Sequence, residues 1–224
     1  METIRIEEKI LAKNDELAVA NRRRFDAAGV WVVSLAGSPG GGKTSLLERT
    51  VPLLAGQWRV GVLEGDVETD RDGRRLAALG VPVVQIITGG TCHLNAGMVQ
   101  RALERMALDQ VDVLFIENVG NLVCPASYGL GEHRRVVVLS TTEGEDKPLK
   151  YPAMFRRADA LVLNKVDLLP YVPVDLAQAR EHARRVNPGL RIFETSCATG
   201  EGIGEWIEWL SERRESWKSA GSTG

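Results

Sequence analysis

Short apolar runs alternate with segments of helical periodicity along most of the chain. Seven runs have the length and the apolar, often β-branched composition of buried strands: 30–36, 60–64, 83–87, 113–116, 135–139, 160–163 and 191–193. Between most of them, apolar residues recur three or four positions apart, as in 96–108 and 174–186. Because strands and helices alternate, we predict an α/β fold with a mostly parallel central sheet and helices on both faces.

The ends of the chain lack this alternation. Residues 4–28 have the pattern of an amphipathic helix, and we expect 1–28 to form a helical extension packed on the main domain. The main domain is predicted to span 29–215, a length that one large α/β domain can fill. Residues 216–224 are mostly small and polar, which predicts a flexible tail.

A phosphate-binding loop is expected directly after the first strand. The sequence GSPGGGKT fits G-x-x-x-x-G-K-[ST] without a mismatch, and a helix-forming segment follows it. The backbone N–H groups of such a loop surround phosphate oxygens, and the helix N-terminus adds partial positive charge. We expect Lys43 to reach the β- and γ-phosphates and Thr44 to bind Mg²⁺. The residues predicted to contact the nucleotide here are Gly37, Ser38, Pro39, Gly40, Gly41, Gly42, Lys43, Thr44 and Ser45.

A second motif indicates which nucleotide is bound. Asn164, Lys165 and Asp167 follow an apolar strand in the order N-K-x-D. The Asp167 carboxylate can accept hydrogen bonds from the adjacent N1–H and N2 amine of guanine, a donor pair that adenine lacks. Lys165 is expected to lie across the base, and Asn164 to hold the loop together. We therefore predict GTP and GDP as ligands. After the last strand, where GTPases place a backbone amide against guanine O6, the predicted contacts are Ser196, Cys197 and Ala198.

Acidic residues at the ends of two other strands can serve Mg²⁺ and the attacking water. Glu117 begins an E-x-x-G sequence, in which the amide of Gly120 is expected to sense the γ-phosphate. Glu64 and Asp66 follow the second strand, and Asp72 comes soon after them. We favour Asp66 and Asp72 as switch residues. The predicted catalytic residues are Lys43, Thr44, Asp66, Asp72 and Glu117, and the predicted Mg²⁺ ligands are Thr44, Asp72 and Glu117.

Composition narrows the class of protein. The 224 residues carry a net charge of −2, which argues against non-specific binding of nucleic acid. Apolar runs of about seven residues are too short to span a bilayer, and the N-terminus lacks a signal-peptide core. Three cysteines, an odd number, do not make a disulfide framework. We expect a cytoplasmic protein without nucleic-acid or membrane partners.

Cys92, His93 and Cys124 are candidate ligands for Ni²⁺ or Zn²⁺, because thiolate and imidazole suit these ions. An adjacent Cys-His pair alone is weak evidence for a metal site, since buried cysteines are usually inert small hydrophobes. Cys124 strengthens it, because it comes just after 117–120 and so lies at the same end of the sheet. Three ligands do not close a site, but a two-fold axis would double them. His133 and His182 are interpreted as ordinary surface residues; Cys197 is interpreted as structural.

The chain resembles the HypB family of hydrogenase-maturation GTPases, within the SIMIBI class of P-loop proteins. The similarity extends over nearly the whole sequence. It includes NDELA at 14–18, EGD at 64–66 with Thr69 and Asp72, CHL at 92–94, ENVGNLVCP at 117–125 and TEGEDKPLKYP at 142–152.

The resemblance implies a SIMIBI G domain that hydrolyses GTP, forms a homodimer when GTP or metal is bound, and carries metal at the dimer interface. It implies that Lys150 reaches across the dimer toward the partner's nucleotide. It also implies a role in nickel insertion into [NiFe] hydrogenase, with the hydrogenase large subunit and a nickel-binding maturation partner as interacting proteins. Many family members carry a Cys- or His-rich stretch before the G domain, whereas the first 91 residues here contain neither residue type.

Other functions remain open at this level. A small-molecule P-loop kinase is disfavoured by the guanine motif. A maturation GTPase for urease or a cobalamin enzyme shares the fold, although urease-type relatives usually have Cys-Pro-His where this chain has Cys92-His93-Leu94. A metal-binding regulatory module with incidental hydrolysis is the remaining alternative.

Overall fold

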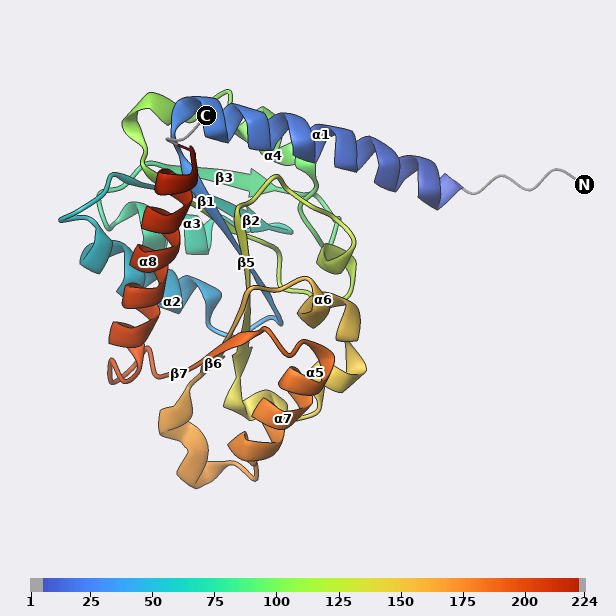
Figure 1. Ribbon diagram of the computed structural model, residues 1–224, viewed down its shortest axis with the longest axis vertical. Coiled ribbons are helices and arrows are strands. Elements are labelled where there is room, and N and C mark those ends of the chain that lie inside the picture. The colour runs from blue at the N-terminus through green and yellow to red at the C-terminus, as the bar shows by residue number, and fades with distance from the viewer. Residues whose placement is uncertain (1–5, 222–224) are drawn as a thin grey trace, which may run out of the picture.

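Seven parallel strands form one central sheet in the computed structural model, which describes residues 6–221 (Figure 1). The strands are β1 (Trp31–Gly37), β2 (Val60–Asp66), β3 (Val83–Ile87), β4 (Val113–Glu117), β5 (Arg134–Ser140), β6 (Ala160–Asn164) and β7 (Arg191–Thr195). Their order across the sheet is β3-β2-β4-β1-β5-β6-β7, which places β1 at the centre. The α/β fold with a parallel sheet is confirmed.

Helices cover both faces of this sheet, which explains why its strands are apolar on both sides. The longer helices are α1 (Ile6–Ala28), α2 (Lys43–Leu54), α3 (Arg71–Ala77), α4 (Ala96–Ala102), α7 (Leu176–Val186) and α8 (Ile203–Gly221), and the short ones are α5 (Lys147–Lys150) and α6 (Pro152–Arg156).

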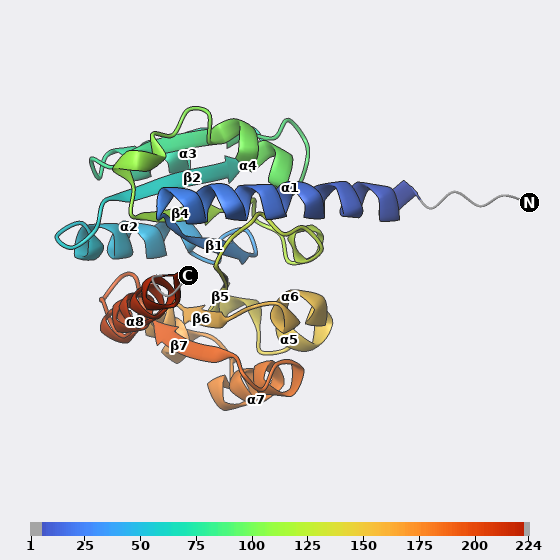
Figure 2. The ribbon, with the colours of Figure 1, turned by 45° about the horizontal axis from the view of Figure 1, so that its top comes forward.

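Alternate residues of β1 enter different hydrophobic clusters. Trp31, Val33 and Leu35 join the cluster formed with α2, α3 and α8, whereas Val32 joins the one formed with α1 and α4. A third cluster packs α6 and α7 against β5 and β6. Figure 2 shows α1 and α4 on one side of the sheet and α2 and α8 on the other. Among residues 6–221, no helix is both long enough and apolar enough to cross a bilayer.

Several boundaries differ from the sequence prediction. β2 continues through Asp66, two residues beyond the predicted run 60–64, so Asp66 lies inside the strand instead of following it. The helix expected over 96–108 ends at Ala102. Leu103, Met106 and Leu108 are nevertheless buried, so the apolar spacing after Ala102 indicated burial of the side chains and not a continuing helix. The predicted tail is wrong for 216–221, which continue α8, while 222–224 lie outside the described residues.

The N-terminal helix packs beside α4, and its first turns extend beyond the sheet (Figure 1). Two buried asparagines fix it. Asn14 donates to the carbonyl of Gly129 at 2.9 Å and accepts from the amide of Ala96 at 2.8 Å. Asn21 donates to the carbonyls of Ala96 and Leu130. α1 therefore braces the start of α4; residues 4 and 5 of the predicted helix lie outside the described residues.

His133 is buried, so its interpretation as a surface residue is wrong. It immediately precedes β5, and its backbone amide already bonds the carbonyl of Val32. Its Nδ1 accepts from the Val32 amide and its Nε2 lies 2.9 Å from Asp26. The ring also packs edge-on against Trp217. Burial lowers the pKa of His133 to about 4, with the Asp26 hydrogen bond opposing it, so the ring is neutral at pH 7.

We predict that His133→Asn flattens the acid limb of the stability profile. Unfolded His133 titrates near 6.5 and folded His133 at about 4, so the unfolded chain binds more protons between these values. The free energy of unfolding contributed by this group therefore falls as pH is lowered through that window. Urea unfolding at about pH 7 and about pH 5 should show a larger loss for the parent than for the variant. Equal losses would contradict the assignment.

Candidate functional site

The predicted nucleotide residues gather at the carboxyl ends of the strands, where ligands bind in open parallel sheets. Two adjoining cavities lie there, of about 420 Å³ and about 530 Å³. The first is lined by the phosphate loop and by the ends of β2 and β4. The second is lined by the start of α2, the end of β6 and the loop after β7. Lys165 borders both cavities, so phosphates and base can occupy them together.

The phosphate loop leaves β1 at Gly37 and enters α2 at Lys43. Gly42 caps the helix with φ 99°, and a side chain there would overlap the amide of Asn164. Lys43 is 7% exposed, and its Nζ lies 3.4 Å from the Ser38 carbonyl. Burial lowers the pKa of Lys43, while neighbouring carboxylates oppose that shift. A buried ammonium at a helix N-terminus favours a phosphate group.

Three carboxylates face this lysine across the first cavity. Glu64, Asp72 and Glu117 each place an oxygen within 4.8 Å of the others. Glu64 on β2 and Glu117 on β4 are register partners, so the two side chains leave the sheet at the same level. The Thr44 hydroxyl donates to Oε1 of Glu117 at 2.8 Å. The other Glu117 oxygen is buried without a partner.

Burial raises the pKa of both buried carboxyl groups. Burial is the main cause at Glu117, which reaches about 7, and the nearby Lys43 charge opposes it. At Glu64, burial and then the Glu117 charge raise the pKa to about 8, although Gln85 donates a hydrogen bond to its carboxylate. At both groups the effect of burial outweighs the interactions that lower the pKa.

The donor set fits Mg²⁺, which takes a P-loop hydroxyl and carboxylate oxygens. Thr44 already contacts Glu117, and the unpartnered Glu117 oxygen supplies a free lone pair. Asp72 joins the same group of oxygens. Asp66 borders the cavity but accepts from the backbone amides of Glu68 and Thr69, which shapes the turn after β2.

Sequence reasoning named Glu64 among the carboxylates near the second strand but did not include it in the catalytic or Mg²⁺-binding residues, and it did not single out Arg75. The position of Glu64 opposite Glu117 becomes clear only from the strand register. Arg75 borders the first cavity and forms ion pairs with Glu48 of α2 and with Asp72. The Arg75 guanidinium thus holds α3 and Asp72 against the phosphate helix. Its only sequence signal was its spacing from Asp72, one helical turn away.

Asn164 links the loops that frame the second cavity. Its Nδ2 donates to the Gly41 carbonyl, and its Oδ1 accepts from the Thr195 hydroxyl and the Cys197 amide. Lys165 has φ 65° and its Nζ donates to the Gly40 carbonyl at 2.8 Å. One buried amide therefore holds the phosphate loop and the base loop at a fixed separation.

Asp167 borders the second cavity and accepts a hydrogen bond from the Ser196 hydroxyl, which orients its carboxylate. Cys197 and Ala198 border the same cavity. Their carbonyls accept from Arg49 of α2, another residue that sequence reasoning did not find. The base loop is thereby tied to the phosphate helix from a second direction.

Lys150 does not line either of the two cavities. It lies at the end of α5 and forms an exposed ion pair with Asp146 at 2.6 Å.

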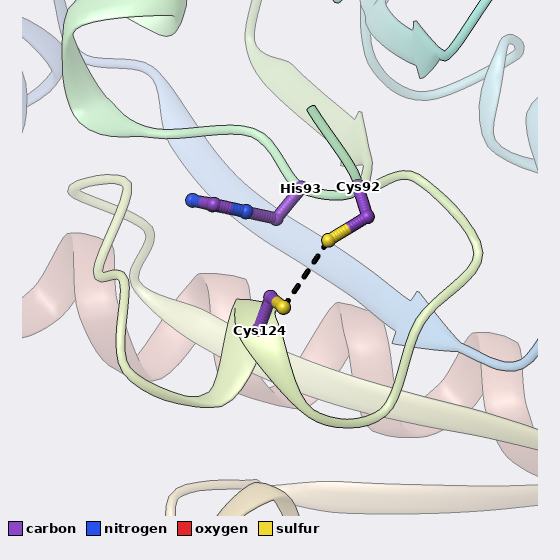
Figure 3. A group of neighbouring side chains, drawn as sticks. All are labelled: Cys92, His93 and Cys124. Carbon is purple, nitrogen blue, oxygen red and sulfur yellow. Dashed lines mark hydrogen bonds between the residues drawn. The ribbon is translucent and has the colours of Figure 1, made fainter. Parts of the chain in front are cut away.

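Cys92, His93 and Cys124 come together as predicted (Figure 3). The two sulfur atoms face each other at 3.1 Å, and the His93 ring extends to one side. Burial lowers the pKa of His93, which favours the neutral imidazole that a metal needs. The ring packs on Tyr128 with centroids 4.2 Å apart, and its Nδ1 is buried without a partner. These groups fit a soft divalent ion that one chain leaves incompletely coordinated.

Short connections join this cluster to the phosphate cavity. Asn118 accepts from the amide of Leu94, and Leu94 packs on Gly65 of β2 with no room for a Cβ between them. Gly120 lies against Pro39 of the phosphate loop; a Cβ there would be 2.9 Å from the Pro39 backbone. The segments that carry the candidate metal ligands therefore pack against β2 and the phosphate loop.

Comparison with known proteins bears on what this arrangement does. A family model described as the CobW/HypB/UreG nucleotide-binding domain matches residues 31–194. The hydrogenase maturation factor HypB of Azotobacter vinelandii is 53% identical over 211 residues, which cover 94% of this chain and 70% of that protein. The chain belongs to the HypB family. The hydrogenase/urease maturation factor HypB of Helicobacter hepaticus is 43% identical, with 95% of this chain and 88% of that protein covered.

Solved HypB structures share the fold. The crystal structure of HypB from Helicobacter pylori in complex with nickel has a TM-score of 0.87 and 38% identity, and covers 91% of this chain and 96% of that chain. The chain is thus a HypB-family protein with a P-loop nucleotide-binding domain, and a relative of similar fold binds nickel.

We predict that Asp167→Asn weakens GTP binding and favours xanthine nucleotide. The amide donates to xanthine O2 where the carboxylate accepted from guanine. Loss of this charge-assisted pair costs about 1.5–3 kcal/mol, roughly a tenfold to hundredfold rise in the Kd for GTP. Ser196→Ala keeps the Asp167 carboxylate but removes the hydroxyl that orients it. This variant should weaken GTP binding less than Asp167→Asn does and leave the base preference unchanged. Titration with fluorescent GTP and XTP analogues measures both; parental affinity in Asp167→Asn would refute the assignment.

Proposed function

We propose that the chain is a GTP-hydrolysing metallochaperone that supports nickel insertion into [NiFe] hydrogenase, with dimerisation linked to GTP and metal. One observation carries the proposal: the segment from Glu117 to Cys124 passes without interruption from the phosphate cavity to the metal ligands. Hydrogenase maturation by the A. vinelandii relative and nickel in the H. pylori complex support the client and the cargo.

In this proposal, Lys43 and the backbone of 37–45 neutralise the phosphates, while Asp167 selects guanine. Thr44, Asp72 and Glu117 hold Mg²⁺, which neutralises charge on the β- and γ-phosphates when bound. Among the described residues, Arg75 is the arginine that borders the phosphate cavity. Its guanidinium group is already engaged in ion pairs with Glu48 and Asp72. Intrinsic hydrolysis is accordingly slow.

The cargo site uses Cys92, His93 and Cys124 of two chains related by a two-fold axis. A shared ion gives the dimer contacts that the monomer lacks, so metal and GTP each favour assembly. Lys150, whose own-chain partner is an exposed Asp146, contacts the nucleotide of the other chain. The hydrogenase large subunit and a nickel-binding maturation protein are the further partners, and the setting is the cytoplasm.

Urease is a second candidate client, because the H. hepaticus relative is a hydrogenase/urease maturation factor. Deleting the gene and assaying both enzymes, with and without added nickel, separates the two clients. A regulatory module with incidental hydrolysis would instead tolerate Lys43→Ala without loss of nickel-enzyme maturation.

We predict that Lys43→Ala lowers GTP turnover by about a hundredfold or more, the usual effect of removing one preorganised charge-stabilising group. The measurement is phosphate release at saturating GTP and Mg²⁺. Lys13→Ala is the matched control, because Lys13 on α1 is 68% exposed and pairs only with Glu16 in the described structure. Turnover by Lys43→Ala at the parental rate would remove this loop from the mechanism.

We predict a monomer with GDP and a dimer with a GTP analogue or with Ni²⁺ or Zn²⁺, as measured by light scattering. Cys92→Ala, His93→Ala and Cys124→Ala should each weaken metal binding and leave nucleotide binding nearly unchanged. Lys150→Ala should weaken the GTP-dependent dimer alone.

His182→Asn is the control, since His182 lies outside both sites and contacts the Glu145 carbonyl. If all three ligand variants keep the parental metal stoichiometry and affinity, the shared site is refuted.

A further inference from the structure

We propose that the Asn121 side chain couples the nucleotide site to the Cys92–Cys124 metal site, so that metal affinity follows the bound nucleotide. The inference rests on the two sites proposed above and names the residue that links them. Asn121 is a positioning residue, because it orients the metal-bearing segments and touches no reacting atom.

The backbone of Asn121 is fixed to the phosphate loop. It forms an isolated antiparallel bridge with Gly37, the residue at which β1 passes into that loop. The preceding Gly120 is packed against Pro39 of the same loop. A γ-phosphate bound between the loop and the Gly120 amide therefore acts directly on the position of Asn121.

The side chain of Asn121 reaches both metal-bearing segments. Its Nδ2 donates to the carbonyl of Cys92 at 3.3 Å, and its Oδ1 accepts from the amide of Val123 at 2.7 Å. One amide thus spans the segments of the two cysteines whose sulfur atoms lie 3.1 Å apart. Such outer contacts orient metal ligands, and their loss typically lowers metal affinity about 10- to 100-fold.

The surrounding fold does not depend on this side chain. The Cys92–Leu94 segment is also held by Asn118, which accepts from the Leu94 amide, and by the packing of Leu94 on Gly65. The bridge between Asn121 and Gly37 uses backbone atoms only. Replacing Asn121 therefore removes the side-chain contact that joins the Cys92 segment to the 121–124 segment, and it leaves each site's own residues and the backbone connection in place.

The test measures Zn²⁺ and Ni²⁺ affinity by competition with a chromophoric chelator, in GDP and in a non-hydrolysable GTP analogue. The parent should bind metal more tightly with the GTP analogue. Asn121→Ala should bind metal about 10- to 100-fold more weakly, with the ratio between the two nucleotide states clearly smaller than in the parent. Asn121→Asp keeps the acceptor for Val123 and loses the donor to Cys92, so its ratio should also be smaller than in the parent. Metal-free GTP affinity should stay parental in both variants, which shows that they are folded.

Reciprocity gives a second readout. Zn²⁺ should tighten binding of the GTP analogue more in the parent than in Asn121→Ala. A parental ratio in Asn121→Ala overturns the inference, even if its absolute metal affinity has fallen. If the parent itself binds no metal through Cys92 and Cys124, or binds it equally with both nucleotides, the proposed linked site fails before the role of Asn121 is reached.

Discussion

The pairing of β4 with β1 and β2 is the constraint on which both sites depend. β4 is buried on both faces, so Glu117 at its end is fixed relative to the phosphate loop. Only seven positions separate Glu117 from Cys124, and that short connection also packs against Pro39 and bonds the Cys92 segment. A tether this short cannot place the metal ligands independently of the phosphates. The two sites therefore form one mechanical unit within a single chain.

The buried charges of the phosphate cavity favour the binding of a charged ligand. Glu64 and Glu117 lie opposite each other in a buried register, and burial raises the pKa of both. Lys43 is the buried cation facing them, and its own pKa is lowered by burial. Buried charges are costly unless they are compensated. A metal–nucleotide complex supplies the missing positive charge to the carboxylates and negative charge to the lysine and the loop amides at the same time.

The strands, their parallel arrangement and the gathering of the motif residues were predictable, because apolar runs and strand ends are local signals. The N-K-x-D and phosphate-loop residues carry their chemistry in their own order. Features that depend on register or on distant contacts were not predictable. Nothing near His133 in the sequence announces its contacts with Asp26 and Trp217, and Arg49 contacts a loop 148 positions away. The extension of α8 through Gly221 was missed for a related reason: Trp217 packs against the core.

The grip of α1 on the start of α4 gives the metal segment a second neighbour. Asn14 holds the amide of Ala96, three positions after His93, and also the carbonyl of Gly129, next to the Tyr128 on which His93 packs. The first turns of α1 extend beyond the sheet (Figure 1). Helix α1 thus helps to position the segments that place His93. A displacement of α1 would therefore reach the segments on both sides of His93, through Ala96 and through Gly129.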